Sequence, residues 1–188
     1  NFFLIIARHT PHKNIPRILK AFCNLKKFNK STKDLRLKII GQYNKKFTPS
    51  YIKLSSKLGI EECCDWIYLI SENEKLELLN RCQALIIASL WEGFGLPALE
   101  AMACGLPIAS TDRGPAPEIL GNAGIYFDPD IPSQIEKSLE ILISSVEKRS
   151  ELSKEAFKNA KNYTWDKCSK ETFNFLSEIL SINNKLSL

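Results

Sequence analysis

The sequence predicts an α/β protein with a doubly wound, six-stranded parallel sheet followed by C-terminal helices. Six short apolar runs alternate with segments of helical periodicity, which is typical of a parallel sheet covered by helices on both faces. After residue 130 only helical patterns follow. With 188 residues, 44% of them hydrophobic, the chain is long enough to bury one core. We therefore expect a single domain over 1–188, with the sheet core in 1–130 and helices in 131–188.

The strand candidates are brief, apolar and bounded by polar residues, glycine or proline. They are Phe2–Ala7, Leu35–Ile40, Trp66–Ile70, Ala84–Ala88, Pro107–Ser110 and Ile125–Phe127. Because crossovers between parallel strands are right-handed, few topologies fit this order of strands and helices.

The helices carry clear start and stop signals. Asn14 is placed to cap the first helix, and Gly59 follows another as a left-handed end. Ser71–Glu74 and Ser133–Glu136 both match the capping box. We expect the last three helices at Ile131–Val146, Arg149–Ala160 and Trp165–Leu180, the last capped by Thr164, with a frayed tail at Ser181–Leu188.

Composition and cysteine usage exclude several classes of protein. The apolar content excludes disorder, and no apolar run is long enough for a membrane span. No secretory signal is visible near Asn1, although a chain that does not begin with Met looks cut from something longer. The six cysteines form no C-x-x-C pair, which disfavours zinc. Cys23, Cys82 and Cys104 lie in apolar segments, a pattern that fits a reducing cytoplasm and disfavours a cysteine nucleophile.

The charge is distributed unevenly along the chain. The net charge is +5, yet residues 1–60 hold 14 of the 26 Lys and Arg residues and one of the 21 acidic residues. Such a basic half could face phosphates, a nucleic acid or an anionic membrane surface, or it could be solvated surface. Nucleic acid is disfavoured because no aromatic residues alternate with the charges and no DNA-binding motif is present.

Three loops that follow predicted strands carry chemistry, because ligands of open α/β sheets bind outside the carboxyl ends of the strands. The first loop, Arg8–Asn14, places Arg8 and Lys13 beside a helix N-terminus, which suits a diphosphate or makes a basic surface loop. His9 and His12 in the same loop are expected to contact phosphate or solvent rather than to act as a general base.

The second loop follows the most apolar strand and leads into a helix. Gly93 and Gly95 flank Phe94 and allow the backbone to approach a ligand closely. Glu92 in the loop and Glu100 one turn into the helix border the same mouth, and their spacing suits paired acceptors for hydroxyl groups better than metal ligands. Trp91 could line the cleft or belong to the core, whereas Trp66 and Trp165 are expected to pack inside.

The third loop, Thr111–Leu120, is rich in glycine and proline and should form one wall of the cleft. Glu118 in this loop either serves the cleft or complements a helix N-terminus. Further along, Asp128-Pro129-Asp130 matches a D-x-D metal motif, but a proline directly after a strand predicts a turn.

These segments resemble the donor-binding half of family-4 retaining glycosyltransferases. The resemblance rests on Arg8…Lys13-Asn14, on the E-x7-E element from Glu92 to Glu100 with its Gly-Phe-Gly-Leu-Pro interior, and on Pro117–Gly124 with Phe127-Asp-Pro129. It covers nearly the whole chain. It implies one half of a GT-B fold, in which two Rossmann-like domains face a cleft and the C-terminal one holds a nucleotide sugar.

The resemblance also implies roles for individual residues. Arg8 and Lys13 would neutralise the diphosphate, and Glu92 would contact the transferred sugar. Glu100 would accept hydrogen bonds from the ribose hydroxyls. The remaining contacts would come from the backbone: Gly93, Phe94, Gly95 and Leu96 toward the sugar, and Ile70 and Ser71 toward the base. Preorganised positive groups ease departure of a nucleoside diphosphate, so no divalent ion and no other cofactor is expected.

The largest departure from the family is that the N-terminal acceptor-binding domain is not in this sequence. We therefore expect the chain to bind a GDP- or UDP-sugar weakly and to transfer no sugar alone. The acceptor would be a glycan or a lipid-linked sugar, and a membrane contact would be peripheral at the inner face. The alternatives are a non-catalytic nucleotide-sugar-binding or partner module and half of a nucleotide-sugar 2-epimerase. By resemblance, the segment Pro11-His12-Lys13-Asn14 suggests a mannosyl or rhamnosyl transferase of surface polysaccharide assembly.

Overall fold

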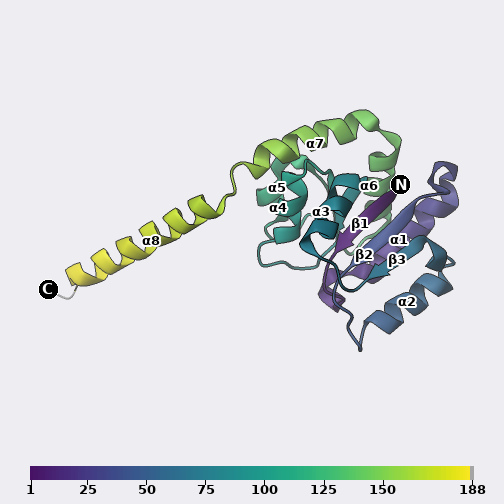
Figure 1. Ribbon diagram of the computed structural model, residues 1–188, viewed down its shortest axis with the longest axis horizontal. Helices are drawn as coiled ribbons and strands as arrows, with labels where there is room; N and C mark the ends of the chain where they lie inside the picture. The colour runs from purple at the N-terminus through teal and green to yellow at the C-terminus, as the bar shows by residue number, and fades with distance from the viewer. Residues whose placement is uncertain (187–188) are drawn as a thin grey trace.

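The computed structural model describes residues 1–186, without the side chains of 181 and 183–186, and it has the predicted α/β architecture (Figure 1). Six parallel strands form one sheet in the order β3-β2-β1-β4-β5-β6. The strands are β1 Phe2–Ile6, β2 Arg36–Ile40, β3 Cys64–Ile67, β4 Ala84–Ile87, β5 Ile108–Thr111 and β6 Gly124–Phe127.

Helices connect the strands and extend the chain after the sheet. The α-helices are α1 Ile15–Phe28, α2 Thr48–Lys57, α3 Glu72–Arg81, α4 Leu96–Ala103, α5 Ala116–Leu120, α6 Pro132–Ser144, α7 Val146–Ala160 and α8 Trp165–Leu186. Short 3-10 helices lie at η1 Pro11–Lys13, η2 Lys30–Thr32, η3 Glu61–Cys63 and η4 Gly121–Ala123. In the described residues, no helix is both long and apolar enough to cross a bilayer.

The sheet separates two apolar cores because successive side chains of a strand point to opposite faces. On one face Phe3 and Ile5 pack with residues of α1, α2 and α6. On the other face Phe2 and Leu4 pack with residues of α3, α4, α5 and α7. Burial on both faces explains why the central strands β1 and β4 are apolar throughout rather than alternating. Nearer the edge of the sheet, β2 and β3 carry the charged residues Arg36, Lys38 and Asp65.

Several sequence predictions are wrong in detail. Pro132 rather than Ser133 begins α6, and no side chain caps this helix. The second capping box does not form, because Ser133 lies inside the first turn of α6 and Glu136 accepts from Asn24 Nδ2 at 3.2 Å. The third strand also ends at Ile67, three residues earlier than expected.

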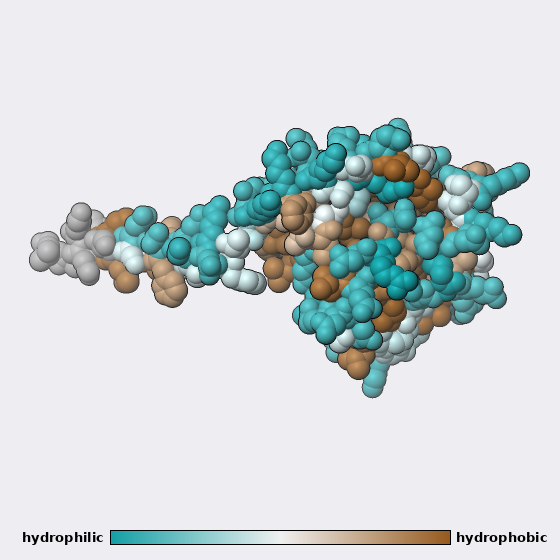
Figure 2. All heavy atoms as spheres, turned by 45° about the horizontal axis from the view of Figure 1, so that its top comes forward, coloured by the Kyte–Doolittle hydropathy of each residue, from teal (hydrophilic) through white to brown (hydrophobic). Residues whose placement is uncertain are grey.

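The C-terminal helix differs most from its prediction. Thr164 caps α8 as expected, since its Oγ1 accepts from the Lys167 N–H at 3.1 Å. However, α8 continues to Leu186 through the tail expected to fray, and residues 187–188 lie outside the described part. Trp165 is 78% exposed, so its predicted core role is wrong. Figures 1 and 2 show that α8 projects away from the sheet. Trp165, at the start of this helix, lines an open hollow with Phe94 and Leu99 instead of entering a core.

Candidate functional site

The site forms where the strand order reverses. The chain builds β2 and β3 on one side of β1 and then continues with β4 on the other side, so the loops after β1 and β4 face each other across a crevice. Ligands of doubly wound sheets bind at this point. The hollow there is lined by Ile5, Ile6, Ala7, Lys13, Ile86, Ile87, Ala88, Ser89, Glu92, Gly95 and Pro97.

An ion pair joins the first and second loops inside this crevice. Lys13 Nζ donates to Glu92 Oε1 at 2.5 Å, and the two side chains are 16% and 18% exposed. Ser89 Oγ donates to the same oxygen at 2.6 Å. Among the described residues no hydrogen bond reaches Glu92 Oε2, which leaves this oxygen available to a ligand. The expected convergence of the two loops is observed, although Lys13 and Glu92 are 79 residues apart.

Further contacts hold the two loops together at the rim. The Leu90 N–H donates to the His12 carbonyl at 2.8 Å. The rings of His12 and Trp91 stack with centroids 4.1 Å apart. Trp91 is 63% exposed, so of its two predicted places the core is excluded. The loops therefore form a joined rim rather than two independent segments.

The remaining polar residues of the first loop have different environments. Arg8 is exposed and lies close enough to His12 to help depress the pKa of that imidazole, which burial and Lys13 lower more strongly. His9 is wholly buried, so the expectation that it contacts phosphate or solvent is wrong. Its Nδ1 lies 2.9 Å from Thr48 Oγ1, its ring meets the edge of Trp66, and burial lowers its pKa.

The start of α4 borders the crevice, since Gly95 and Pro97 line it. Gly95 takes a left-handed φ of 99° at the N-cap, which a residue with a Cβ rarely adopts. No side chain caps this helix start, and Pro97 in its first turn has no N–H to satisfy. Gly93 and Phe94 are exposed, and no atom lies within 4 Å of a Cβ placed on Gly93. The loop thus has room for a ligand against its backbone.

Glu100 lies on α4 and lines a hollow between α3 and α4 together with Lys75 and Leu76. It is not among the described residues that line the crevice. It accepts from Lys75 Nζ of α3 at 3.0 Å, and its side chain is 39% exposed. Burial disfavours the charged amine of Lys75, but hydrogen bonds to Glu72 and Glu100 outweigh this effect and raise its pKa. No sequence pattern points to Lys75 as part of the site, because its partner Glu100 lies 25 residues away on another helix.

Ile70 and Ser71 lie between β3 and α3. The capping box predicted here is confirmed: Ser71 Oγ accepts from the Glu74 N–H, and Glu74 Oε2 accepts from the Ser71 N–H at 2.8 Å. The Ser71 carbonyl accepts from the Lys75 N–H at 3.0 Å. Because both backbone groups of Ser71 serve α3, Ile70 is the better placed of the two for a contact with a base.

The third loop packs beside the crevice and is tied to the strand end of β6. Arg113 Nη2 lies 2.7 Å from Asp128 Oδ1 and 2.6 Å from Asp130 Oδ2. Arg17 of α1 pairs with the other oxygen of Asp130 at 2.9 Å. The Asp-Pro-Asp segment is the turn that the sequence predicts, and its carboxylates contact arginines. Glu118 is exposed in the first turn of α5.

The comparison with protein families decides what this chain is related to. The family model for glycosyl transferases group 1 matches residues 1–159. The chain belongs to this family. The resemblance indicated by the three loop motifs is therefore confirmed.

Two curated relatives of this group 1 glycosyltransferase carry mannosyltransferase names. The chain is 26% identical over 176 residues to O-antigen chain mannosyltransferase B of Escherichia coli, which covers 92% of this chain and 45% of the relative. It is 28% identical over 178 residues to RfbU of Salmonella typhimurium, also an O-antigen chain mannosyltransferase, with 95% and 47% covered. The chain thus spans about half the length of the curated relatives it matches.

Solved structures share the fold of this group 1 glycosyltransferase. A glycosyltransferase from Rickettsia africae superposes with a TM-score of 0.85 at 19% identity, over 95% of this chain and 48% of that one. HepE of Anabaena, solved in complex with UDP and glucose, has a TM-score of 0.84 at 17% identity, over 94% and 48%. The C-terminal domain of LpcC from Francisella tularensis, a glycosyl transferase group 1 family protein, has a TM-score of 0.74 at 25% identity, over 86% of this chain and 84% of that one.

Proposed function

We propose that this chain is the donor-binding half of a metal-independent, retaining glycosyltransferase that moves a sugar from a nucleoside-diphosphate sugar to a glycan or lipid-linked acceptor. The observation that carries the proposal is the contact of Lys13 Nζ with Glu92 Oε1 in the crevice between β1 and β4. A cation, an acid and the uncapped start of α4 meet there. These are groups that a diphosphate and a sugar require.

Each group has a defined task in this proposal. The ammonium group of Lys13 donates one hydrogen bond to Glu92 and has further N–H groups for the diphosphate. Together with Arg8, Lys13 neutralises the negative charge that develops on the diphosphate. Glu92 contacts the transferred sugar through Oε2. The free N–H groups at Gly93, Phe94, Gly95 and Leu96 favour an anion, as helix N-termini do.

The nucleoside lies farther along the cleft in the same proposal. Glu100 accepts the ribose hydroxyls at the open side of α4, with Lys75 holding its carboxylate. The base meets the segment at Ile70 and Ser71. No cofactor is required, since fixed cations do the work that a divalent ion does elsewhere; the arginine partners of Asp128 and Asp130 make these two acids poor metal ligands.

The relatives support the donor class and suggest the process. O-antigen mannosyltransferases among them favour a GDP-sugar or UDP-sugar and a place in surface polysaccharide assembly, on the cytoplasmic side with at most peripheral membrane contact. Since the chain spans about half of these relatives, the acceptor contacts belong to residues beyond it, and the chain alone transfers no sugar. A 2-epimerase half or a non-catalytic binding module remains as the second candidate.

Calorimetric titration with UDP, GDP and ADP tests the proposal. We expect weak binding of one of them to the chain and no sugar transfer by it. No binding of any at about 1 mM, where the binding free energy is only about 4 kcal/mol, would end the donor-site assignment. Sugar transfer by the chain alone would contradict the division of labour between two halves.

A further inference from the structure

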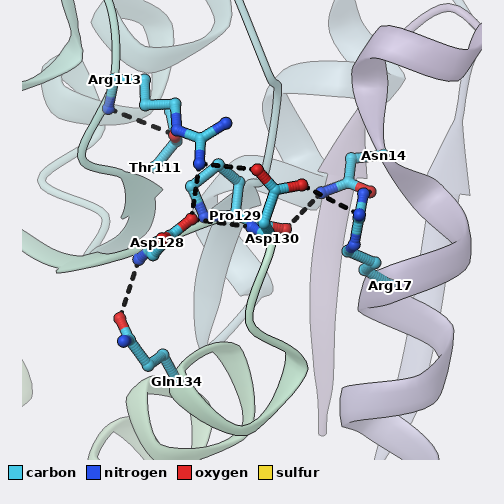
Figure 3. A network of polar contacts seen from close by, with 8 residues as sticks. All are labelled: Asn14, Arg17, Thr111, Arg113, Asp128, Pro129, Asp130 and Gln134. Carbon is cyan, nitrogen blue, oxygen red and sulfur yellow. Dashed lines mark hydrogen bonds and ion pairs between the residues drawn. The ribbon is translucent and has the colours of Figure 1, made fainter.

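We propose that Asn14 is a positioning residue that holds Lys13 against Glu92, and that the turn after β6 anchors it. The test of this inference by nucleotide binding rests on the proposed function, whereas its test by the reactivity of Lys13 does not. The proposal follows from a chain of polar contacts that runs from the third loop to the residue after Lys13 (Figure 3).

Asn14 has an unusual backbone. Its φ is 58° and its ψ 27°, and among the described residues it is the one non-glycine residue with a positive φ. This left-handed conformation is strained for a residue with a Cβ, although Asn tolerates it better than most. It separates the 3-10 turn that carries Lys13 from α1. The direction of the Lys13 side chain therefore depends on this residue as well as on the contacts of His12 with the second loop.

The side chain of Asn14 is fixed at both ends rather than used as a helix cap. Its Nδ2 donates to the Pro129 carbonyl at 2.7 Å, and its Oδ1 accepts from Arg17 Nη1 at 3.0 Å. The sequence prediction that Asn14 caps α1 is right in position and wrong in mechanism, since its side chain makes no capping bond. With 3% exposure, Asn14 is a buried anchor between α1 and the turn after β6.

The anchor is itself held by four charges. Asp130 lies between Arg17 at 2.9 Å and Arg113 at 2.6 Å, and Arg113 also reaches Asp128 at 2.7 Å. The Asp130 N–H donates to Asp128 Oδ1 at 2.9 Å, which closes the turn around Pro129. Figure 3 shows Asp130 between the two arginines, with Pro129 facing Asn14. The Pro129 carbonyl, which accepts from Asn14, is therefore held in place by ion pairs between the loops that follow β5 and β6.

A matched set of variants distinguishes the effect of the left-handed backbone of Asn14 from the effect of its side-chain hydrogen bonds. Asn14→Gly allows the left-handed conformation without strain but removes both side-chain bonds. Asn24→Ala is the control, because Asn24 also joins α1 to α6, through Glu136 at 3.2 Å, without lying beside Lys13. Asp130→Asn keeps the size of the side chain and removes the charge between the arginines, so its effect should be smaller than that of Asn14→Gly.

The first readout needs no ligand. Acetylation of Lys13 by acetic anhydride, measured by mass spectrometry against the exposed Lys20, reports how tightly the amine is held. We expect Asn14→Gly to raise the relative rate about fivefold, the equivalent of about 1 kcal/mol for one lost hydrogen bond, and Asn24→Ala to leave it unchanged. An unchanged rate in Asn14→Gly would overturn the proposal, as would an equal rise in Asn24→Ala.

The second readout is the affinity for UDP or GDP, measured by calorimetry in a double-mutant cycle. Asn14→Gly should weaken binding about fivefold in the wild-type background and not at all in a Lys13→Met background. Equal losses in both backgrounds would show that Asn14 does not act through Lys13. If the wild-type chain binds no nucleotide, the proposed function fails, and the acetylation rates still decide the role of Asn14.

Discussion

Glu92 and Glu100 belong to one sequence element but lie in two different environments. Glu92 is 18% exposed in the crevice and is held by Lys13 and Ser89. Glu100 is 39% exposed on the outer side of α4 and is held by Lys75. Coulomb interactions strengthen as solvent is excluded, so the same loss of charge should cost more at Glu92. Glu92 and Glu100 therefore show that a sequence motif specifies which residues are present, whereas the tertiary structure decides their partners and exposure.

The largest effect is expected on the cations of the crevice. In an enzyme that joins this chain to an acceptor-binding half, Lys13→Met and Arg8→Ala should each lower turnover by about 10²–10³-fold, because leaving-group charge loses its stabilisation. Steady-state kinetics with the donor varied measures this. Lys20→Met is the control on the exposed face of α1. Turnover within a factor of about two of wild type would move the diphosphate site elsewhere.

The next effect concerns Glu100 as a nucleoside contact. Glu100→Ala should weaken donor affinity by about 10–150-fold, the equivalent of about 1.5–3 kcal/mol for hydrogen bonds to a charged group. Glu72→Ala is the matched control, because Glu72 is the other carboxylate that contacts Lys75, at 2.7 Å. Calorimetry with UDP and GDP distinguishes the two. Equal, small changes in both variants would reduce Glu100 to a surface partner of Lys75.

The comparison is sharpened by stability. Glu92→Gln should lower the free energy of unfolding by about 1–2 kcal/mol, since Lys13 then lacks its charged partner in a confined site. Glu100→Gln should change it by less than about 0.5 kcal/mol, as for exposed pairs. Urea denaturation of both variants measures the difference. A larger loss for Glu100→Gln would reverse the order expected from the two environments.

The smallest effect is a pH dependence from the buried histidine. Burial lowers the pKa of His9 from its usual 6.5, so as pH falls the unfolded chain takes up this proton before the folded chain does. The contribution of neutral His9 to the free energy of unfolding is therefore fully present above pH 6.5. It declines as the pH falls through 6.5 toward the lower pKa of His9 in the folded state. Urea denaturation between about pH 5 and pH 8 should show this decline, with a shallower slope in His9→Gln. His12→Gln is the comparison, because the imidazole of His12 also has a lowered pKa. This variant should retain the part of the pH dependence that comes from His9. An unaltered slope in His9→Gln would contradict this assignment.

The sequence was sufficient to predict the fold and the convergence of the first and second loops, but not the direct ion pair of Lys13 with Glu92. Apolar runs of strand length predict a parallel sheet, and loops that follow parallel strands meet at one edge whatever their separation in sequence. The resemblance carried by the E-x7-E element from Glu92 to Glu100 and by the two other loops was specific enough to indicate the family.

What the sequence did not predict depends on partners far away in the chain. His9 is buried because Thr48, 39 residues later, supplies its hydrogen bond. The side chain of Asn14 does not cap α1, because it donates to the Pro129 carbonyl, 115 residues away. Trp165 is exposed because α8 leaves the sheet, which no local pattern of apolar residues reveals. Local rules fail at these positions because a tertiary contact, or the lack of one, decides them.

Titration of the ¹⁵N-labelled chain with GDP and UDP, followed by NMR, tests the central claim most directly. We predict that the backbone signals of Lys13, Gly93, Gly95 and Glu100 shift together and yield a single dissociation constant. Saturable shifts confined to another surface would contradict the account, as would an absence of any shift at about 1 mM nucleotide.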